Sequence, residues 1–302
     1  MKDEISFDRS VIEPTGQAIT ISPLVRRLVA PNGGPFTFTG TCTYLVGQGD
    51  VAVIDPGPEL DAHLDALITA IGTARVSAIV VTHTHKDHSP LSRRLKALTG
   101  APLIGCGPHQ AARELGEGET NMLDASADHD HMPDRLMQDG EEFEGEGFTL
   151  QAVATPGHTM NHLAFALREE NALFSGDHVM AWSTSIVAPP DGSMGAYMAS
   201  LERLMARDET IYWPGHGGPV KEPGRFVRGL LSHRRMREAT IAERVQAGDR
   251  YIVSIVEKLY AGLDPKLKGA AALSVFAHLE DMVARGLVRT EDGARLDGEY
   301  WV

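Results

Sequence analysis

Three histidines and one aspartate crowd into six residues of this chain, directly after a short apolar run. The run Val76–Val81 is typical of a buried strand, and His83, His85, Asp87 and His88 follow it. Four ionisable groups left unpaired in a folded protein would carry a large desolvation cost. A bound metal ion satisfies them together, since imidazole nitrogen and carboxylate oxygen suit zinc, and also iron or manganese. The segment therefore predicts a metal site at a strand end, where loops commonly build sites.

Three further candidate ligands have the same local setting. His158, Asp177 and His216 each follow a run of strand type, and each stands directly after or beside a glycine that lets the backbone turn closely. Seven ligands are enough to fill a site for two metal ions. The complete candidate set is His83, His85, Asp87, His88, His158, Asp177 and His216.

Strands and helices alternate over the first two thirds of the chain. A hairpin is expected at 41–54, where β-branched runs flank a glycine-rich turn. Apolar spacing favours helices at 59–72, 89–99, 108–115 and 193–207. Further strands are predicted at 76–81, 102–106, 148–155, 162–167, 172–175 and 210–213. This pattern suits helices packed outside sheets, which is an α/β layered domain.

The last part of the chain has a different pattern. It predicts helices at 224–248, 251–259 and 270–285, followed by a small β-wing at 287–293. Three helices and a wing describe a winged-helix module. We therefore expect a catalytic domain over residues 1–224 and a winged-helix domain over residues 225–302.

The order of these ligands, His-x-His-x-Asp-His, then His, then Asp, then His, resembles that of the metallo-β-lactamase superfamily. The resemblance covers roughly residues 30–220 and implies a four-layer αββα sandwich with a dinuclear site at one edge. It implies that one metal is held by three histidines and the other by one aspartate and two histidines. The first set is His83, His85 and His158; the second is Asp87, His88 and His216; Asp177 would bridge both metals.

A closer resemblance is to the β-lactamase-like protein 2 family. It is carried by the segments 35–45, 157–163 and 275–280 together with the winged helix, although Cys42 stands where that family has Asn. Its eukaryotic members are endoribonucleases, and many bacterial members are known only as metal-dependent hydrolases. Asp177 points away from the β-lactamases proper and toward the glyoxalase II and RNase-processing branch. Persulfide dioxygenases share the first motif but bind a single iron and lack the C-terminal module.

The charge of the chain argues against a polyanionic substrate. Residues 1–224 hold 15 basic and 30 acidic residues, and the segment 117–146 alone carries a balance of −10. Such a surface repels nucleic acid. The segment is expected to be a solvated acidic loop, with His129 and His131 outside the metal cluster. The winged helix shows no basic stripe, so we expect it to pack against the catalytic domain or to form a dimer contact.

The resemblance and the ligands together imply a mechanism. Two metals lower the pKa of a bridging water, so that hydroxide attacks a carbonyl carbon or a phosphorus at neutral pH. Asp87 is the expected catalytic proton acceptor, and Tyr44, Thr159 and Asn161 are candidates to bind the substrate at its developing oxyanion. The leading prediction is a dinuclear zinc hydrolase of a small ester or thioester.

Three alternatives stay open. The first is a single-strand endoribonuclease, the second a mononuclear iron enzyme like the persulfide dioxygenases, and the third a nonenzymatic binding module that uses the winged helix. The sequence also predicts a cytoplasmic protein, since it has only Cys42 and Cys106, no apolar N-terminal run and no stretch of the ~20 apolar residues that a membrane helix needs.

Overall fold

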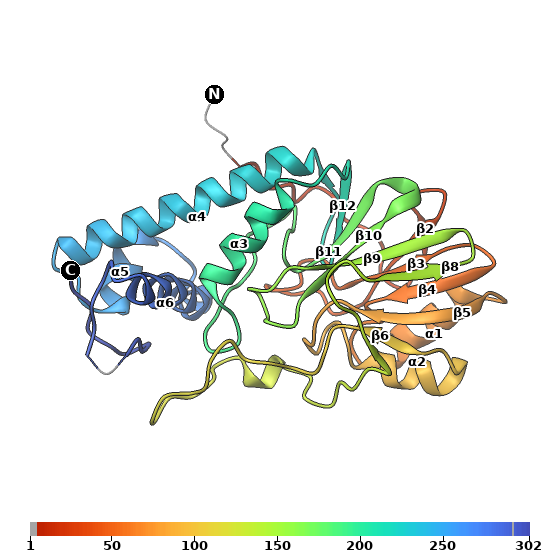
Figure 1. Cartoon of the computed structure of the whole chain (residues 1–302), viewed down its shortest axis with the longest axis horizontal. Helices are drawn as coiled ribbons and strands as arrows, with labels where there is room; N and C mark the ends of the chain where they lie inside the picture. The colour runs from red at the N-terminus through yellow and green to blue at the C-terminus, as the bar shows by residue number, and fades with distance from the viewer. Residues whose placement is uncertain (1–4, 292) are drawn as a thin grey trace.

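The computed structural model describes residues 5–291 and 293–302 and contains two stacked sheets flanked by helices, with a helical lobe at one end (Figure 1). The first sheet has seven strands in the order β1-β2-β3-β4-β5-β6-β7. Its strands are β1 (Ile19–Thr20), β2 (Val25–Val29), β3 (Cys42–Val46), β4 (Asp50–Ile54), β5 (Arg75–Val81), β6 (Leu103–Gly105) and β7 (Arg135–Leu136).

The second sheet has six strands in the order β13-β12-β11-β10-β9-β8. Its strands are β8 (Glu142–Gly145), β9 (Phe148–Ala154), β10 (Leu163–Leu167), β11 (Ala172–Gly176), β12 (Ile211–Pro214) and β13 (Val220–Lys221). The central strands of both sheets, such as β3, β5 and β10, are apolar and almost wholly buried, because both faces of each sheet are covered.

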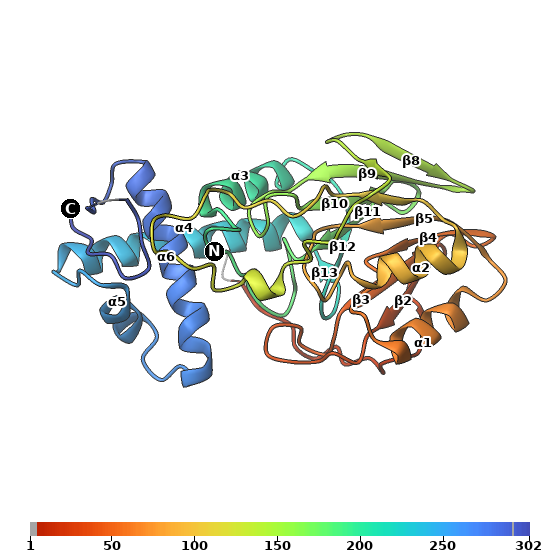
Figure 2. The same ribbon diagram turned by 90° about the horizontal axis from the view of Figure 1, so that it is seen from below.

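Helices cover the outer faces of the two sheets. The helices α1 (Asp61–Ile71) and α2 (Leu91–Thr99) lie beside the first sheet, and α3 (Met194–Leu204) lies beside the second (Figure 2). Leu67 of α1 and Leu95 of α2 join one apolar core with residues of both sheets, including Phe165 of β10. Leu201 of α3 belongs to a second core on the far face of the second sheet. The four-layer αββα sandwich predicted from the sequence is therefore confirmed.

The C-terminal lobe consists of α4 (Pro223–Gln246), α5 (Ile252–Leu259) and α6 (Lys268–Ala284) around its own apolar core. The predicted wing is reduced to isolated bridges, one of which pairs Arg289 with Trp301; position 292 lies outside the described residues. The predicted division after residue 224 falls in the first turn of α4. Leu230 in this helix packs with the catalytic sandwich, whereas Ile241 packs in the lobe, so α4 runs through both cores.

The predicted helix at 108–115 is wrong. This segment has bends and no helical turn, and contacts to distant parts of the chain hold it in place. The amide of Ala112 donates to the carbonyl of Pro190 at 2.7 Å. Arg113 pairs with Glu119 and with Glu280 of α6. Tertiary pairing has here overridden a favourable local helix propensity.

Candidate metal centre

Four strands end at one edge of the sandwich, and the seven candidate ligands follow these ends. His83 to His88 follow β5, His158 follows β9, Asp177 follows β11 and His216 follows β12. Residues far apart in the sequence thus come together: His83, His85 and His158 form one group of three, Asp87, His88 and His216 form a second, and Asp55 forms a third with His83 and His88. Within each group, the possible ligand atoms all lie within 4.8 Å of one another.

The three-histidine group consists of His83, His85 and His158. His83 Nε2 lies 3.2 Å from His85 Nδ1, and His158 Nε2 lies 3.0 Å from the same atom. Zinc–nitrogen bonds of ~2.0–2.1 Å in a tetrahedral site place ligand nitrogens about 3.3 Å apart. These separations therefore fit three lone pairs that converge on one cation.

The aspartate–histidine group consists of Asp87, His88 and His216. The two Nε2 atoms of the histidines lie 3.2 Å apart. Asp87 Oδ2 lies 3.3 Å from His88 Nε2 and 3.2 Å from His216 Nε2. This donor set of one carboxylate and two imidazoles also suits zinc, iron or manganese.

Asp177 lies between the two groups. Its Oδ2 is 3.3 Å from His216 Nε2 and 3.8 Å from His158 Nε2, so one oxygen faces both groups. Its Oδ1 is buried and accepts no hydrogen bond from the described residues, although it lies 3.5 Å from His88 Nε2. A buried carboxylate oxygen without a donor is costly unless a cation satisfies it. The residues present therefore fit a pair of divalent ions that share Asp177.

The two groups differ in their protonation. Burial, and then the neighbouring His158, lowers the pKa of His85 to about 3, so the three-histidine group presents neutral rings. Burial also opposes the charged form of His216, but the carboxylates of Asp177 and Asp87 outweigh it and raise its pKa to about 9. Burial is likewise outweighed at His88, whose pKa Asp87 and Asp177 raise well above its usual value. A cation bound at this group would replace the protons on its two histidines.

Hydrogen bonds behind the rings set their orientation. His158 Nδ1 donates to the carbonyl of Ile186 at 2.5 Å, and His216 Nδ1 donates to the carbonyl of Gly40 at 3.3 Å. His88 Nδ1 lies 3.0 Å from Asp55 Oδ2. In each case the Nε2 atom is left to face the centre, which is how outer partners commonly orient metal-binding histidines.

Asp55 is a supporting residue that the sequence does not reveal, since Asp55-Pro56-Gly57-Pro58 reads only as the end of a hairpin. Its carboxylate also accepts hydrogen bonds from the amide of Thr82 at 2.8 Å and from the Thr82 hydroxyl at 2.7 Å. It therefore holds both His88 and the start of the ligand loop. The sequence offers one signal for this role: Asp55 comes directly after a strand, as several of the candidate metal ligands do.

The three candidate substrate contacts are engaged with the protein itself. Tyr44 is 2% exposed, and its hydroxyl donates to the carbonyl of Pro214 at 2.7 Å. The Thr159 hydroxyl donates to Asn161 Oδ1 at 2.8 Å, and Asn161 Nδ2 donates to the Thr84 hydroxyl at 2.9 Å. All three side chains thus make hydrogen bonds within the protein, and their contact with a substrate stays a prediction.

The acidic segment is less solvated than expected. Asp128 is buried, accepts a hydrogen bond from Ser89 at 2.6 Å and pairs with Arg93 at 2.9 Å. His131 is also buried, and its Nε2 lies 3.2 Å from the carbonyl of Cys106. Most of the segment 117–146 is exposed, as a solvated loop requires, but Asp128 and His131 anchor it in the interior. Neither His131 nor the exposed His129 belongs to the two ligand groups.

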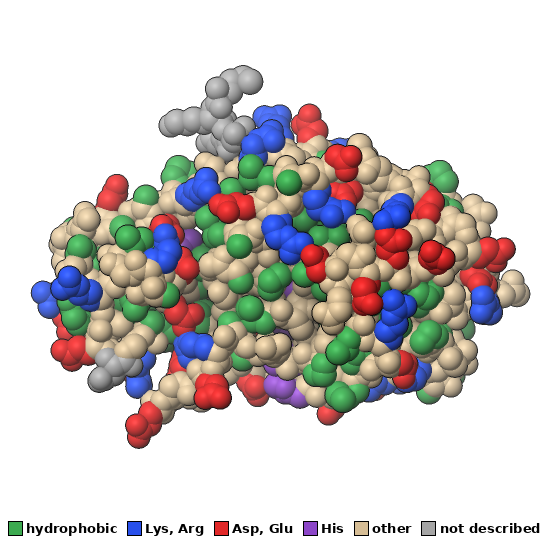
Figure 3. Space-filling view, in the orientation of Figure 1, with side chains coloured by type: hydrophobic (Ala, Val, Ile, Leu, Met, Phe, Trp, Pro, Cys, Tyr) green, Lys and Arg blue, Asp and Glu red, His purple; other side chains and the backbone are tan. Residues whose placement is uncertain are grey.

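A cavity of about 490 Å³ lies near the three-histidine group: its wall includes His109, whose Nδ1 lies 3.1 Å from the hydroxyl of Thr84, the residue between His83 and His85. The backbone of the partly exposed His85 pairs with that of Ala127. Two residues near Ala127 in the sequence, Asp124 and His129, line the cavity. Its other lining residues include Arg113, Leu115, Asn121, Pro190 and Asp191. In Figure 3, histidine and acidic side chains lie close together on the surface at the lower edge of the molecule.

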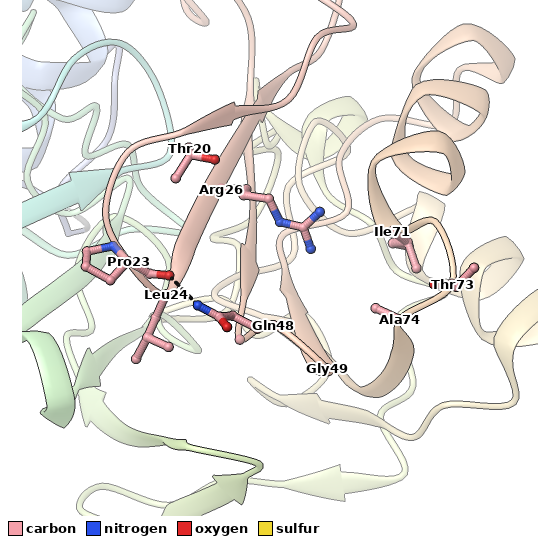
Figure 4. A pocket seen from close by; sticks show the side chains of 10 residues that line it. Thr20, Pro23, Leu24, Arg26, Gln48, Gly49, Ile71, Thr73 and Ala74 are labelled. Atoms are coloured by element: carbon pink, nitrogen blue, oxygen red, sulfur yellow. Dashed lines mark hydrogen bonds between the residues drawn. The ribbon is translucent and has the colours of Figure 1, made fainter.

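A second cavity, of about 540 Å³, lies at the other end of the sandwich (Figure 4). It is lined by Arg26, by the β3–β4 turn at 47–49 and by the end of α1 at Ile71. Across it, Gln48 Nε2 donates to the carbonyl of Pro23 at 3.2 Å. Because strand β3 runs from the metal-centre edge toward this turn, the cavity lies away from the candidate ligands.

The catalytic part of the chain matches a known family model. Residues 36–216 match the model described as the metallo-beta-lactamase superfamily. The chain belongs to the metallo-beta-lactamase superfamily. Residues 252–299 match the beta-lactamase associated winged helix domain, which agrees with the module predicted for the C-terminal part.

Relatives within the superfamily include thioesterases. An atrochrysone carboxyl ACP thioesterase of Paecilomyces divaricatus is 34% identical over 246 residues, which cover 80% of this chain and 71% of the relative. A beta-lactamase-like protein 2 homolog of Caenorhabditis elegans is 29% identical over 275 residues, which cover 89% of this chain and 87% of the relative. The predicted resemblance to that family is thus confirmed, and the chain is a hydrolase of the metallo-beta-lactamase superfamily.

One solved structure aligns with both the catalytic sandwich and the C-terminal lobe of this chain. A metallo-beta-lactamase family protein of Thermus thermophilus aligns with a TM-score of 0.76 at 23% identity, covering 93% of this chain and 99% of that one. At this identity the likeness establishes the fold. Among the described residues, no helix has the length and apolar character needed to cross a membrane.

Proposed function

We propose that this chain is a dinuclear, zinc-dependent hydrolase of small, uncharged acyl esters and thioesters. The observation that carries the proposal is the position of Asp177 between two complete groups of three ligands, with one oxygen facing His158 and His216 together. His83, His85 and His158 would hold one ion, and Asp87, His88 and His216 the other. Histidine and carboxylate donors favour zinc, with iron or manganese as the alternatives.

The bound ions would polarise the substrate carbonyl and lower the pKa of a water molecule between them. The protein then has to receive the proton that this water loses. Asp87 suits this task, because 27% of its side chain is exposed whereas Asp177 is more deeply buried. The Thr41 hydroxyl, 3.4 Å from Asp87 Oδ2, helps to hold the carboxylate in place.

The cavity beside His85 would receive the acyl group. It combines apolar surface from Ala111, Leu115 and Pro190 with carboxylates from Asp124 and Asp191. Its guanidinium, Arg113, is already paired with two glutamates. An acyl chain that ends in a carboxylate would meet repulsion here, so we propose an uncharged acyl group. The thioesterases among the relatives support a thioester as the scissile bond.

Replacement of Asp177 tests the dinuclear proposal. Asp177→Ala should yield a folded protein that retains less than two metal ions per chain and loses most thioester hydrolysis, because the shared carboxylate is gone. Elemental analysis and steady-state kinetics measure both effects. Asp61→Ala is a matched control, since it removes an exposed carboxylate whose ion-pair partner among the described residues is Arg94 at the surface. Two tightly held metal ions in Asp177→Ala would refute the proposal.

A further inference from the structure

Arg234 is a buried cation at the junction between α4, α6 and the catalytic sandwich. The residue is 3% exposed, and no carboxylate of the described residues forms an ion pair with it. Its Nη2 instead donates to the carbonyl of Ser185, and its Cζ lies 5.1 Å from the centre of the Tyr197 ring. Because burying a cation without a counter-ion is costly, these contacts have to be specific and well formed to stabilise it.

Ser185 is also tied to the ligand Asp177. The Ser185 hydroxyl donates to the backbone carbonyl of Asp177 and lies 2.8 Å from that of His178. The hydroxyl of Tyr197, whose ring Arg234 covers, donates to the same His178 carbonyl at 3.0 Å. The backbone that carries Asp177 is therefore held from two sides by groups that contact Arg234.

The next residue, Ile186, holds a second ligand. Its carbonyl accepts the hydrogen bond from His158 Nδ1 at 2.5 Å, and His158 Nε2 then lies 3.0 Å from His85 Nδ1. A shift of the backbone at 185–186 would therefore move Asp177 and turn His158 at the same time. One of these side chains belongs to the three-histidine group, and the other lies between both groups.

We propose that Arg234 is a positioning residue of the metal centre. By holding the Ser185 carbonyl from α4, it fixes the backbone at 185–186 and thereby the positions of Asp177 and His158. Retention of metal at the active site then depends on a helix that also forms the core of the winged-helix lobe. This inference rests on the proposed metal site and adds a role for the C-terminal part of the chain, since Arg234 Nη1 also lies 3.5 Å from Ser274 Oγ of α6.

A purely structural role for Arg234 gives a different expectation. If the side chain only fills space between the lobes, its replacement lowers the melting temperature by the same amount with and without metal, and zinc affinity stays unchanged. If it positions the ligands, zinc affinity itself falls. Zinc affinity, rather than stability or activity, is therefore the readout that separates the two roles.

The experiment compares full-length wild type, Arg234→Met, Arg234→Lys and Arg235→Met. Arg235 is the matched control, because it is the next residue of the same helix, is exposed and pairs with Glu202 at the surface. Zinc affinity is measured by competition with a chromogenic chelator, and folding by circular dichroism. We expect Arg234→Met to bind zinc about 10- to 100-fold more weakly, the usual effect of losing an outer partner of a metal site. Arg234→Lys should recover part of the affinity, and Arg235→Met should match wild type.

Ser185→Ala keeps the test decisive if Arg234→Met does not fold. It removes the hydroxyl that reaches Asp177 and leaves the guanidinium in place, and it should also weaken zinc binding at least several-fold. Wild-type affinity in folded Arg234→Met, or in Ser185→Ala where Arg234→Met is unfolded, would overturn the inference. Wild-type protein that takes up no zinc would instead refute the proposed function, and this inference with it.

Discussion

Gly215 and Gly157 lie so close to the metal centre that neither has room for a side chain. A Cβ atom on Gly215 would lie 2.4 Å from Asp177 Oδ1 and 2.7 Å from His88 Cε1. Gly157 has a φ of +140°, and a Cβ atom there would lie 2.3 Å from the Cα of Tyr197. These glycines let the ligand loops approach one another and the start of α3.

Gly215→Ala should therefore disrupt the metal centre without disturbing the rest of the sandwich. The added methyl group must displace Asp177 or His88, and we expect zinc affinity to fall at least tenfold. The measurement is chelator competition on purified protein. Gly269→Ala is the control, because a Cβ atom at that exposed position meets nothing within 4 Å. Unchanged zinc affinity in Gly215→Ala would show that these side chains are not ligands.

The sequence predicts residues that bind metal better than residues that support them. His83 and its neighbours form a dense motif, and the structure places them together with the distant His216. Asp55 is a single acidic residue before a proline, which is a pattern shared by many turns. Its contact with His88 forms only when β4 and β5 pair. Tyr44 is predicted to bind substrate from its position in the chain alone, and the pattern gives no sign that its side chain is buried in the core.

At the scale of elements, the sequence predicts most of the regular structure but not what the connecting segments do. The hairpin at 41–54 forms with Tyr44 opposite Ile54. The strands with buried apolar runs also form where expected, because their pattern is local. The segment 107–131 could not be predicted, since its course depends on partners in α6 and at Pro190.

Arg113 should control substrate binding through this segment. Arg113 lines the cavity, and its guanidinium pairs with Glu119 and with Glu280 on α6. Arg113→Met should loosen the wall and raise KM for a neutral acyl thioester several-fold, with a smaller change in kcat and no change in metal content. Steady-state kinetics test this, with Arg135→Met as the control at a surface pair in the same acidic region. A fall in kcat alone would contradict this role.

His278 on α6 should make the C-terminal lobe sensitive to acid. Both its ring nitrogens are buried without a hydrogen-bond partner among the described residues, and burial, with Arg234 nearby, lowers its pKa to about 3. Below pH ~6.5 the unfolded chain takes up a proton that the folded chain cannot, so stability falls as the pH drops toward 3.

His278→Leu should remove this dependence. The difference in free energy of unfolding between His278→Leu and wild type should grow in favour of the variant by about 1.4 kcal/mol for each pH unit below 6. Urea unfolding at pH 7 and pH 5, with a chelator present in both series, measures the difference. Parallel pH profiles for the two proteins would show that His278 takes up its proton in the folded state as readily as in the unfolded one.

At the scale of the whole molecule, charge separates the proposed substrates from RNA. The chain carries a net charge of −13, and α6 presents Glu280, Asp281 and Arg285 rather than a basic stripe. The acidic residues of α6 pair with Arg113 and Arg285 of this same chain. The lobe contacts the catalytic sandwich through Glu280 and Ala277 of α6, and the charge of this helix does not favour a phosphate backbone.

We accordingly expect weak binding of single-stranded RNA at ~150 mM salt, since affinity for a polyanion needs clustered cations and falls steeply with salt. A gel-shift and cleavage assay with purified protein tests this. Metal-dependent cleavage of RNA at physiological salt that disappears in Asp87→Ala would contradict the expectation and promote the endoribonuclease alternative.

We propose a neutral acyl thioester as the substrate of a centre in which two metal ions share Asp177. The most direct test is a zinc titration of metal-depleted protein while thioester hydrolysis is followed by release of the free thiol. Activity should rise until two zinc ions are bound per chain and then level off. Full activity in the presence of excess chelator, or no hydrolysis at two bound zinc ions, would contradict the proposed function.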